Sequence, residues 1–140
     1  NVIYNWGTDA AHGNPRSANL VNNWFRAGPE TTRAQVWRAQ TSQVAPDLVA
    51  GSVYLAGNVA DGFGYKVDAP ASQLAASPRC GGLSVTPEAA DAAYAGVIAN
   101  AGATAPLRDA VDVRVIDNVT SRKGSFVNGA GYAAPNPYWP

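Results

Sequence analysis

The sequence contains little charge. Only 14% of its 140 residues are charged, and ten basic residues balance ten acidic residues. A chain without an excess of either sign has no broad electrostatic field that could attract nucleic acid or an anionic membrane surface. The composition therefore argues against both kinds of partner.

Cysteine and histidine are almost absent. Cys80 is the single cysteine, which excludes an internal disulfide and a cysteine-based zinc site, and the single histidine, His12, cannot form a histidine cluster. A lone cysteine packs as a small hydrophobic residue more often than it acts as a nucleophile. The sequence leaves the role of this residue open.

Long apolar runs are missing as well. No stretch is long enough to span a bilayer, and the first residues lack the basic and then apolar layout of a signal peptide. The length of 140 residues and the apolar fraction of 46% are sufficient for one domain with a hydrophobic core. We therefore expect a single domain over residues 1–140.

Three asparagines recur at the ends of short β-prone runs. Asn1, Asn23 and Asn58 are each followed by an apolar residue, at separations of 22 and 35 residues. The first separation lies within the roughly 20 to 50 residue periods of solenoid proteins. Stacked strands lie about 4.8 Å apart, so aligned amide side chains can bond along the stack. The pattern predicts a structural asparagine ladder, although asparagine is also common in turns for local reasons.

The expected fold is mainly β. The spacing predicts a right-handed parallel β-helix, a solenoid whose rungs occupy residues 1–67. Proline, alanine, serine and glycine predict an irregular linker over residues 68–85. A helical cover is expected over 86–124, and an extended tail over 125–140.

Two helices are expected in the cover. The first runs from about Pro87 to Ala101, with Thr86 as its N-cap and Gly102 beyond its end. The second runs from Asp109 to about Ser121, and its valines at four-residue steps predict one face that packs on a core. These valines are Val111, Val115 and Val119.

Several motifs resemble one known family. Asn1 to Gly7, Asn19 to Pro29, Val53 to Asn58 and Arg108 to Ile116 are similar, in this order, to the C-terminal part of bacterial and fungal pectate lyases of the parallel β-helix type. The resemblance extends from Asn1 to about Gly129. It implies a secreted, extracellular protein related to enzymes that cleave polygalacturonate by β-elimination.

The resemblance also implies that the catalytic groups are absent. In the family, calcium is held by carboxylates and an arginine removes the proton, and these residues lie on rungs that precede the position of Asn1. Proton abstraction next to a carboxylate needs both the cation and the base. We therefore expect no catalytic residue, no metal and no cofactor in this chain, with calcium required only by the complete family enzyme, and the sequence leaves its status as an enzyme open.

Two functions follow from these expectations. The first is the C-terminal part of a pectate-lyase-like protein, inactive alone, whose expected partners are the missing N-terminal rungs and an acidic polysaccharide. The alternative is a structural, self-assembling extracellular β-solenoid module that stacks on copies of itself, because unpaired strand edges template further pairing. An open head-to-tail stack would form a filament.

Candidate substrate contacts are basic residues of the first forty positions. His12 could act as a base and Arg16 as a carboxylate clamp in the loop that also holds Asp9, although such a loop is commonly only solvated. Arg26 and Arg33 could line a groove for an acidic sugar polymer, because guanidinium groups bind carboxylates in bidentate fashion. The alternative for these arginines is a solvated surface role.

Overall fold

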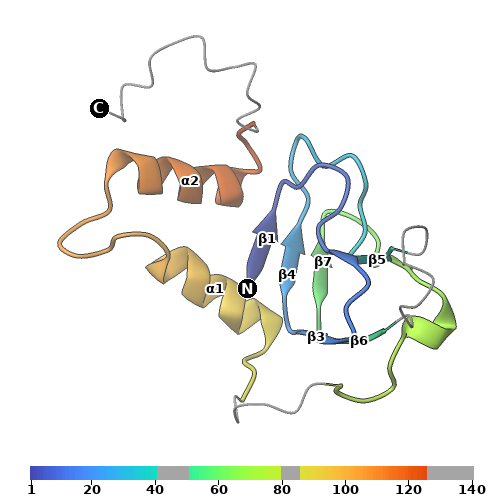
Figure 1. The fold of residues 1–140 in the computed structure, drawn as a ribbon. Coiled ribbons are helices and arrows are strands. Elements are labelled where there is room, and N and C mark those ends of the chain that lie inside the picture. Colours follow the sequence, from blue (N-terminus) through green and yellow to red (C-terminus); the bar gives the residue numbers. More distant parts are fainter. Residues whose placement is uncertain (41–50, 80–85, 126–140) are drawn as a thin grey trace.

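The computed structural model describes residues 1–40, 51–79 and 86–125. In these ranges the chain forms short strands first and two helices afterwards (Figure 1). The elements are β1 (Val2–Tyr4), β2 (His12–Gly13), β3 (Ser17–Val21), β4 (Trp24–Arg26), β5 (Trp37–Ala39), β6 (Ser52–Ala56), β7 (Val59–Asp61), β8 (Val67–Asp68), the 3-10 helix η1 (Ala71–Gln73), α1 (Ala90–Asn100) and α2 (Ala110–Ser121).

The strands form three small sheets in which every pairing is parallel. The strand orders are β1-β4-β7, β2-β5-β8 and β3-β6. In the first sheet Ile3 lies beside Phe25, and Phe25 lies beside Ala60. Because side chains alternate across a strand, this column points into the interior while its neighbours in each strand point outward.

The core lies between these sheets. Phe25 and Val36 are almost completely buried, and the ring of Trp6 meets Phe25 edge to face with centroids 6.3 Å apart. The ring of Phe63 also meets Trp6 edge to face, with centroids 5.4 Å apart. Aromatic pairs in this geometry stabilise a core beyond their burial alone, so Trp6 is the centre of the packing.

The prediction of a right-handed parallel β-helix is wrong. The described residues form separate sheets of three, three and two short strands, and they form neither a continuous solenoid nor a closed sheet. A solenoid needs at least three stacked repeats to bury a continuous core. Here the third sheet ends after β6, because the chain beyond β8 turns into η1 and contributes only a single bridge from Leu74 to Val53.

Helix α1 covers the β1-β4-β7 sheet. Tyr94 stacks on Trp24 with ring centroids 4.8 Å apart, and Ala90 is buried. The helix begins later than predicted, because its N-cap is Ala89 and not Thr86. The Glu88 carbonyl accepts a hydrogen bond from Asn22 Nδ2 at 2.6 Å, which holds the preceding segment against the turn before β4.

Helix α2 packs much less closely. Asp109 is its N-cap and accepts hydrogen bonds from the backbone N–H groups of Val111 and Asp112, each at 2.9 Å. No residue of α2 is buried, and the side chain of Val115 is 49% exposed. The predicted burial of its valine face is therefore wrong, and its attachment to the rest of the protein is mainly polar.

Some predictions lie beyond the part of the chain that the structure describes. These are Cys80, the end of the linker and the tail after Ser125. Among the described residues, no helix is long and apolar enough to cross a membrane.

Candidate interaction site

Asn1, Asn23 and Asn58 stand in one row at the start of the β1-β4-β7 sheet. Asn1 Nδ2 donates to Asn23 Oδ1 at 2.8 Å, and Asn23 Nδ2 donates to Asn58 Oδ1 at 2.9 Å. Asn58 Nδ2 ends the row by donating to the Leu20 carbonyl at 2.8 Å. Asn23 is buried, so these bonds satisfy an amide that water cannot reach.

Strand β1 is an edge of its sheet. Its hydrogen bonds to β4 involve Asn1, whose carbonyl accepts from Trp24 N–H at 2.8 Å, and Asn5, whose N–H donates to the Arg26 carbonyl at 3.2 Å. Backbone groups of alternate residues point to opposite sides of a strand. The N–H and C=O groups of Val2 and Tyr4 therefore point away from β4, along an edge to which no described strand is paired.

An open hollow lies beside this edge. Its volume is about 410 Å³, and it is bounded by β1, β3 and the segment before α1. Most of the lining is apolar, and the apolar lining residues are Ile3, Ala11, Leu20, Val21, Phe25 and Pro87. Asn1 also lines a second groove of about 460 Å³ along α1, so this helix forms a wall beside the free edge (Figure 1).

A charged cluster around Asp9 lies on the β2-β5-β8 side. Arg38 donates to both carboxylate oxygens of Asp9, at 2.7 and 2.6 Å, and Gln35 Nε2 donates to Oδ1 at 3.2 Å. The hydrogen bond from Arg38 lowers the pKa of Asp9, against the opposing effect of burial. The carboxylate is thus held as an anion whose acceptor sites are used internally.

The structure brings only part of the predicted charged site together. His12 is exposed and lies beside Arg38 in the β2–β5 pairing, and Arg33 reaches Asp9 at 3.7 Å with a half-exposed side chain. Arg16 is exposed just before β3, with no side-chain hydrogen bond or ion pair to another described residue. No ligand site is formed by these residues as a group.

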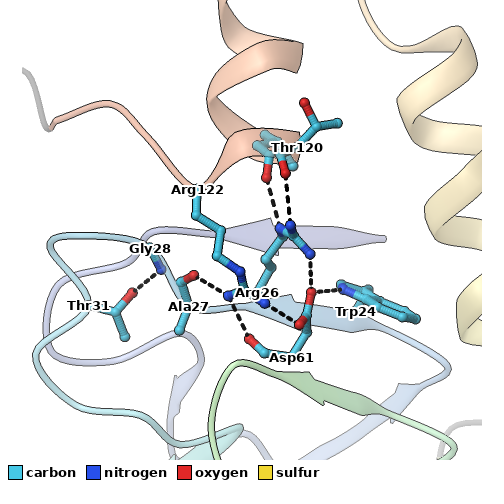
Figure 2. Close-up of polar contacts among 9 residues, drawn as sticks. Trp24, Arg26, Ala27, Gly28, Thr31, Asp61, Thr120 and Arg122 are labelled. Atoms are coloured by element: carbon cyan, nitrogen blue, oxygen red, sulfur yellow. Dashed lines mark hydrogen bonds and ion pairs between the residues drawn. The ribbon is translucent and has the colours of Figure 1, made fainter.

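Arg26 lies elsewhere and has a structural role. Figure 2 shows its guanidinium between Asp61 and the end of α2. It forms an ion pair with Asp61 and donates to the carbonyls of Val119, at 2.8 Å, and Thr120, at 2.9 Å. A cation at the last turn of a helix stabilises the unpaired carbonyl groups there. Arg26 therefore caps α2 and its donors are not available to a substrate.

Asp61 is the centre of this second cluster. It accepts from Arg26, from Arg122 and from Trp24 Nε1, the last at 3.1 Å. Burial alone would raise the pKa of Asp61, but the hydrogen bond from Trp24 and the charge of Arg26 outweigh it and keep the pKa below its usual value. One carboxylate thus joins two sheet residues to the end of α2.

Sequence reasoning missed Asp61 and Arg122. The one available signal was the scarcity of charge, which makes each carboxylate a candidate for an internal ion pair. The described residues contain no group of three histidine, cysteine, aspartate or glutamate side chains that could hold a metal ion. Among the described residues, the free edge of β1 is the strand edge that lies beside the apolar hollow.

Comparison with known proteins adds no relative. No protein-family model, no curated protein and no solved structure matches this chain. The resemblance to pectate lyases therefore stays a prediction.

Proposed function

We propose that this chain is a docking module that binds an extended polypeptide segment, as an additional parallel strand, along the free edge of β1. The observation that carries this proposal is the combination of outward backbone groups at Val2 and Tyr4 with the apolar hollow beside them. An unpaired strand edge is a template for another strand. An apolar hollow next to it supplies a place for the side chains of that strand.

This arrangement is the one used in recognition by strand addition. Main-chain hydrogen bonds provide the affinity, and pockets for alternate side chains provide the specificity. Here the residue of the added strand that aligns with Ile3 and Phe25 would point into the hollow between β1 and β3. An apolar residue at that position would cover surface that the described residues leave open to solvent.

The opposite end of the protein is a poorer complement to this edge. Leu74 bridges to Val53 there, and Ala75 N–H donates to the Val53 carbonyl at 2.9 Å. The free side of β6 is therefore partly occupied by the chain around η1. This asymmetry favours an extended segment as the occupant over head-to-tail stacking of identical copies, which is the other outcome of the test.

A peptide with the sequence of residues 22–28 is a suitable probe, because it contains the sequence of β4. In the folded protein β4 pairs in parallel with β1, along the edge of β1 that lies opposite the free edge. We expect saturable binding in a nuclear magnetic resonance titration, with amide shifts confined to β1, β3 and α1. Val2→Pro removes an outward N–H and is tolerated at a strand edge, so it should weaken binding about fivefold for one lost hydrogen bond without unfolding the protein.

The matched control is Ala60→Pro on the far edge of the same sheet, with circular dichroism to check that it stays folded, because the Ala60 side chain packs against the core. Val59 N–H donates inward to the Asn23 carbonyl, so Ala60 N–H points away from β4 as Val2 N–H does. This variant should bind the peptide normally. Equal weakening by both variants, or no saturable shift at millimolar peptide, would overturn the proposal. If the protein instead forms concentration-dependent assemblies, and both Ala60→Pro and Val2→Pro abolish them, the occupant of the β1 edge is a second copy of this chain.

The relationship to pectate lyases is a second proposal, carried by the sequence motifs alone. In this proposal the strand bound at β1 belongs to the part of a pectate-lyase-like protein that holds the calcium and the base. The isolated chain should then release no unsaturated products from polygalacturonate with calcium. Release of such products by the purified chain would contradict this division of roles.

A further inference from the structure

The direction of hydrogen bonding along the asparagine row specifies a feature of the docked strand. We infer that the segment bound at β1 carries an asparagine beside Asn1, whose side-chain Nδ2 and backbone N–H both donate to Asn1 Oδ1. This inference rests on the docking function proposed above, and it names the residue by which the module recognises its partner.

The existing row shows the pattern that the partner would continue. Asn58 Oδ1 accepts two hydrogen bonds from Asn23, one from its backbone N–H and one from its Nδ2, both at 2.9 Å. Asn23 Oδ1 in turn accepts from Asn1 Nδ2 at 2.8 Å. The Oδ1 atoms of Asn23 and Asn58 thus accept from the asparagine on the β1 side, and the Nδ2 atoms of Asn1 and Asn23 donate toward β7.

Asn1 Oδ1 is the next acceptor in this series. Asn1 is exposed, and no described residue donates to its side-chain oxygen, although its Nδ2 is used by Asn23. Asn1 also lines both the hollow beside β1 and the groove along α1, so its amide lies where an added strand would begin. Only a residue with both an acceptor and a donor can continue the row, which fits the amide of asparagine and excludes an aspartate carboxylate.

In the probe peptide, the residue that would lie beside Asn1 of the protein is Asn23, by analogy with the place of Asn23 beside Asn1 in the sheet. We expect Asn23→Asp and Asn23→Leu in the peptide to weaken binding about tenfold, because Asn1 Oδ1 would lose the side-chain donor of the peptide. Asn22→Ala in the peptide is the matched control, because it removes the neighbouring amide outside the row, and it should change binding less than twofold.

A double-mutant cycle tests the pairing itself. In the Asn1→Ala protein the preference for asparagine over leucine in the peptide should fall from about tenfold to less than twofold, because the two amides no longer meet. Circular dichroism checks that the Asn1→Ala protein remains folded. Retention of the full preference in that protein would overturn the inference, since the asparagine would then be recognised elsewhere.

The failure of this inference differs from the failure of the docking function. If no peptide binds, strand docking at β1 is itself excluded. If all peptides bind equally well and Val2→Pro weakens them all, docking at the edge stands and the asparagine inference is overturned.

Discussion

Arg122, sixty-one residues after Asp61 in the sequence, donates to both the side-chain carboxylate and the main-chain carbonyl of Asp61 (Figure 2). Arg122 lies just beyond α2 in a left-handed conformation that ends the helix. Tyr4 Oη donates to the neighbouring Lys123 carbonyl at 2.6 Å. Helix α2 buries no side chain, so these polar contacts at its C-terminal end are what hold it to the β1-β4-β7 sheet.

Replacement of Asp61 by asparagine should therefore loosen α2. We expect a loss of about 1–2 kcal/mol in the free energy of unfolding, because charged hydrogen bonds are lost from a site that water partly screens. Hydrogen exchange should accelerate at the amides of α2 more than at those of α1. Asp117→Asn, an exposed change on α2 itself, is the control, and a similar acceleration there would contradict this role of Asp61.

Stability should fall in acid through the same carboxylate and through Asp9. Both have a pKa below the usual value of 3.8 in the folded protein. Their contribution is fully present above the pKa of the unfolded chain and is lost as the pH falls through the lower folded pKa. The melting temperature should thus drop steeply below pH about 3.8. The Asp9→Asn, Asp61→Asn double variant should show a flatter dependence, and an unchanged slope would count against both assignments.

Asn23 should be a stabilising residue. Asn23→Leu removes a buried amide and leaves Asn1 Nδ2 and Asn58 Oδ1 without their partner, which should cost about 1–3 kcal/mol in the free energy of unfolding. Chemical denaturation measures this loss. The control is Asn100→Leu, since Asn100 is exposed and its side chain bonds, among the described residues, only the Gly96 carbonyl of its own helix. Equal stability of the two variants would show that the row contributes nothing.

The core should depend on Phe25 more than on any exposed apolar residue. Phe25 is 1% exposed and Leu107 is 82% exposed. Phe25→Ala should destabilise the protein by about 3–5 kcal/mol through the cavity that it leaves. Leu107→Ala should change stability by no more than about 0.5 kcal/mol. Equilibrium unfolding of both variants distinguishes the two, and a small effect of Phe25→Ala would place the core elsewhere.

Local patterns in the sequence predicted the elements better than their assembly. The apolar run from Val53 to Ala56 indicates β6, and the glycines after each helix indicate where α1 and α2 end. Both signals depend only on residues that are close together in the sequence. Gly102 has positive φ just beyond the end of α1, as glycines after helices commonly do, whereas α2 ends at Arg122, two residues before Gly124. In contrast, β2 has the composition of a loop and becomes a strand only because His12 and Gly13 pair with β5.

The charged sites depended on contacts that no local pattern contains. Arg26 was predicted to meet a substrate, yet its partners lie in β7 and at the end of α2, 35 to 94 residues away. Likewise, the periodic valines of α2 predicted a buried face, but none of them is fully buried and Val115 is 49% exposed. The spacing of three asparagines indicated which side chains align, and it did not determine how many strands stack in each sheet.

Residue-resolved hydrogen exchange of the protein with and without the 22–28 peptide is the most direct measurement of strand docking. We expect new protection at the outward amides of Val2 and Tyr4, while the inward amide of Asn5, already bonded to the Arg26 carbonyl, changes little. Unchanged exchange at Val2 and Tyr4 under saturating peptide would contradict docking at the edge of β1.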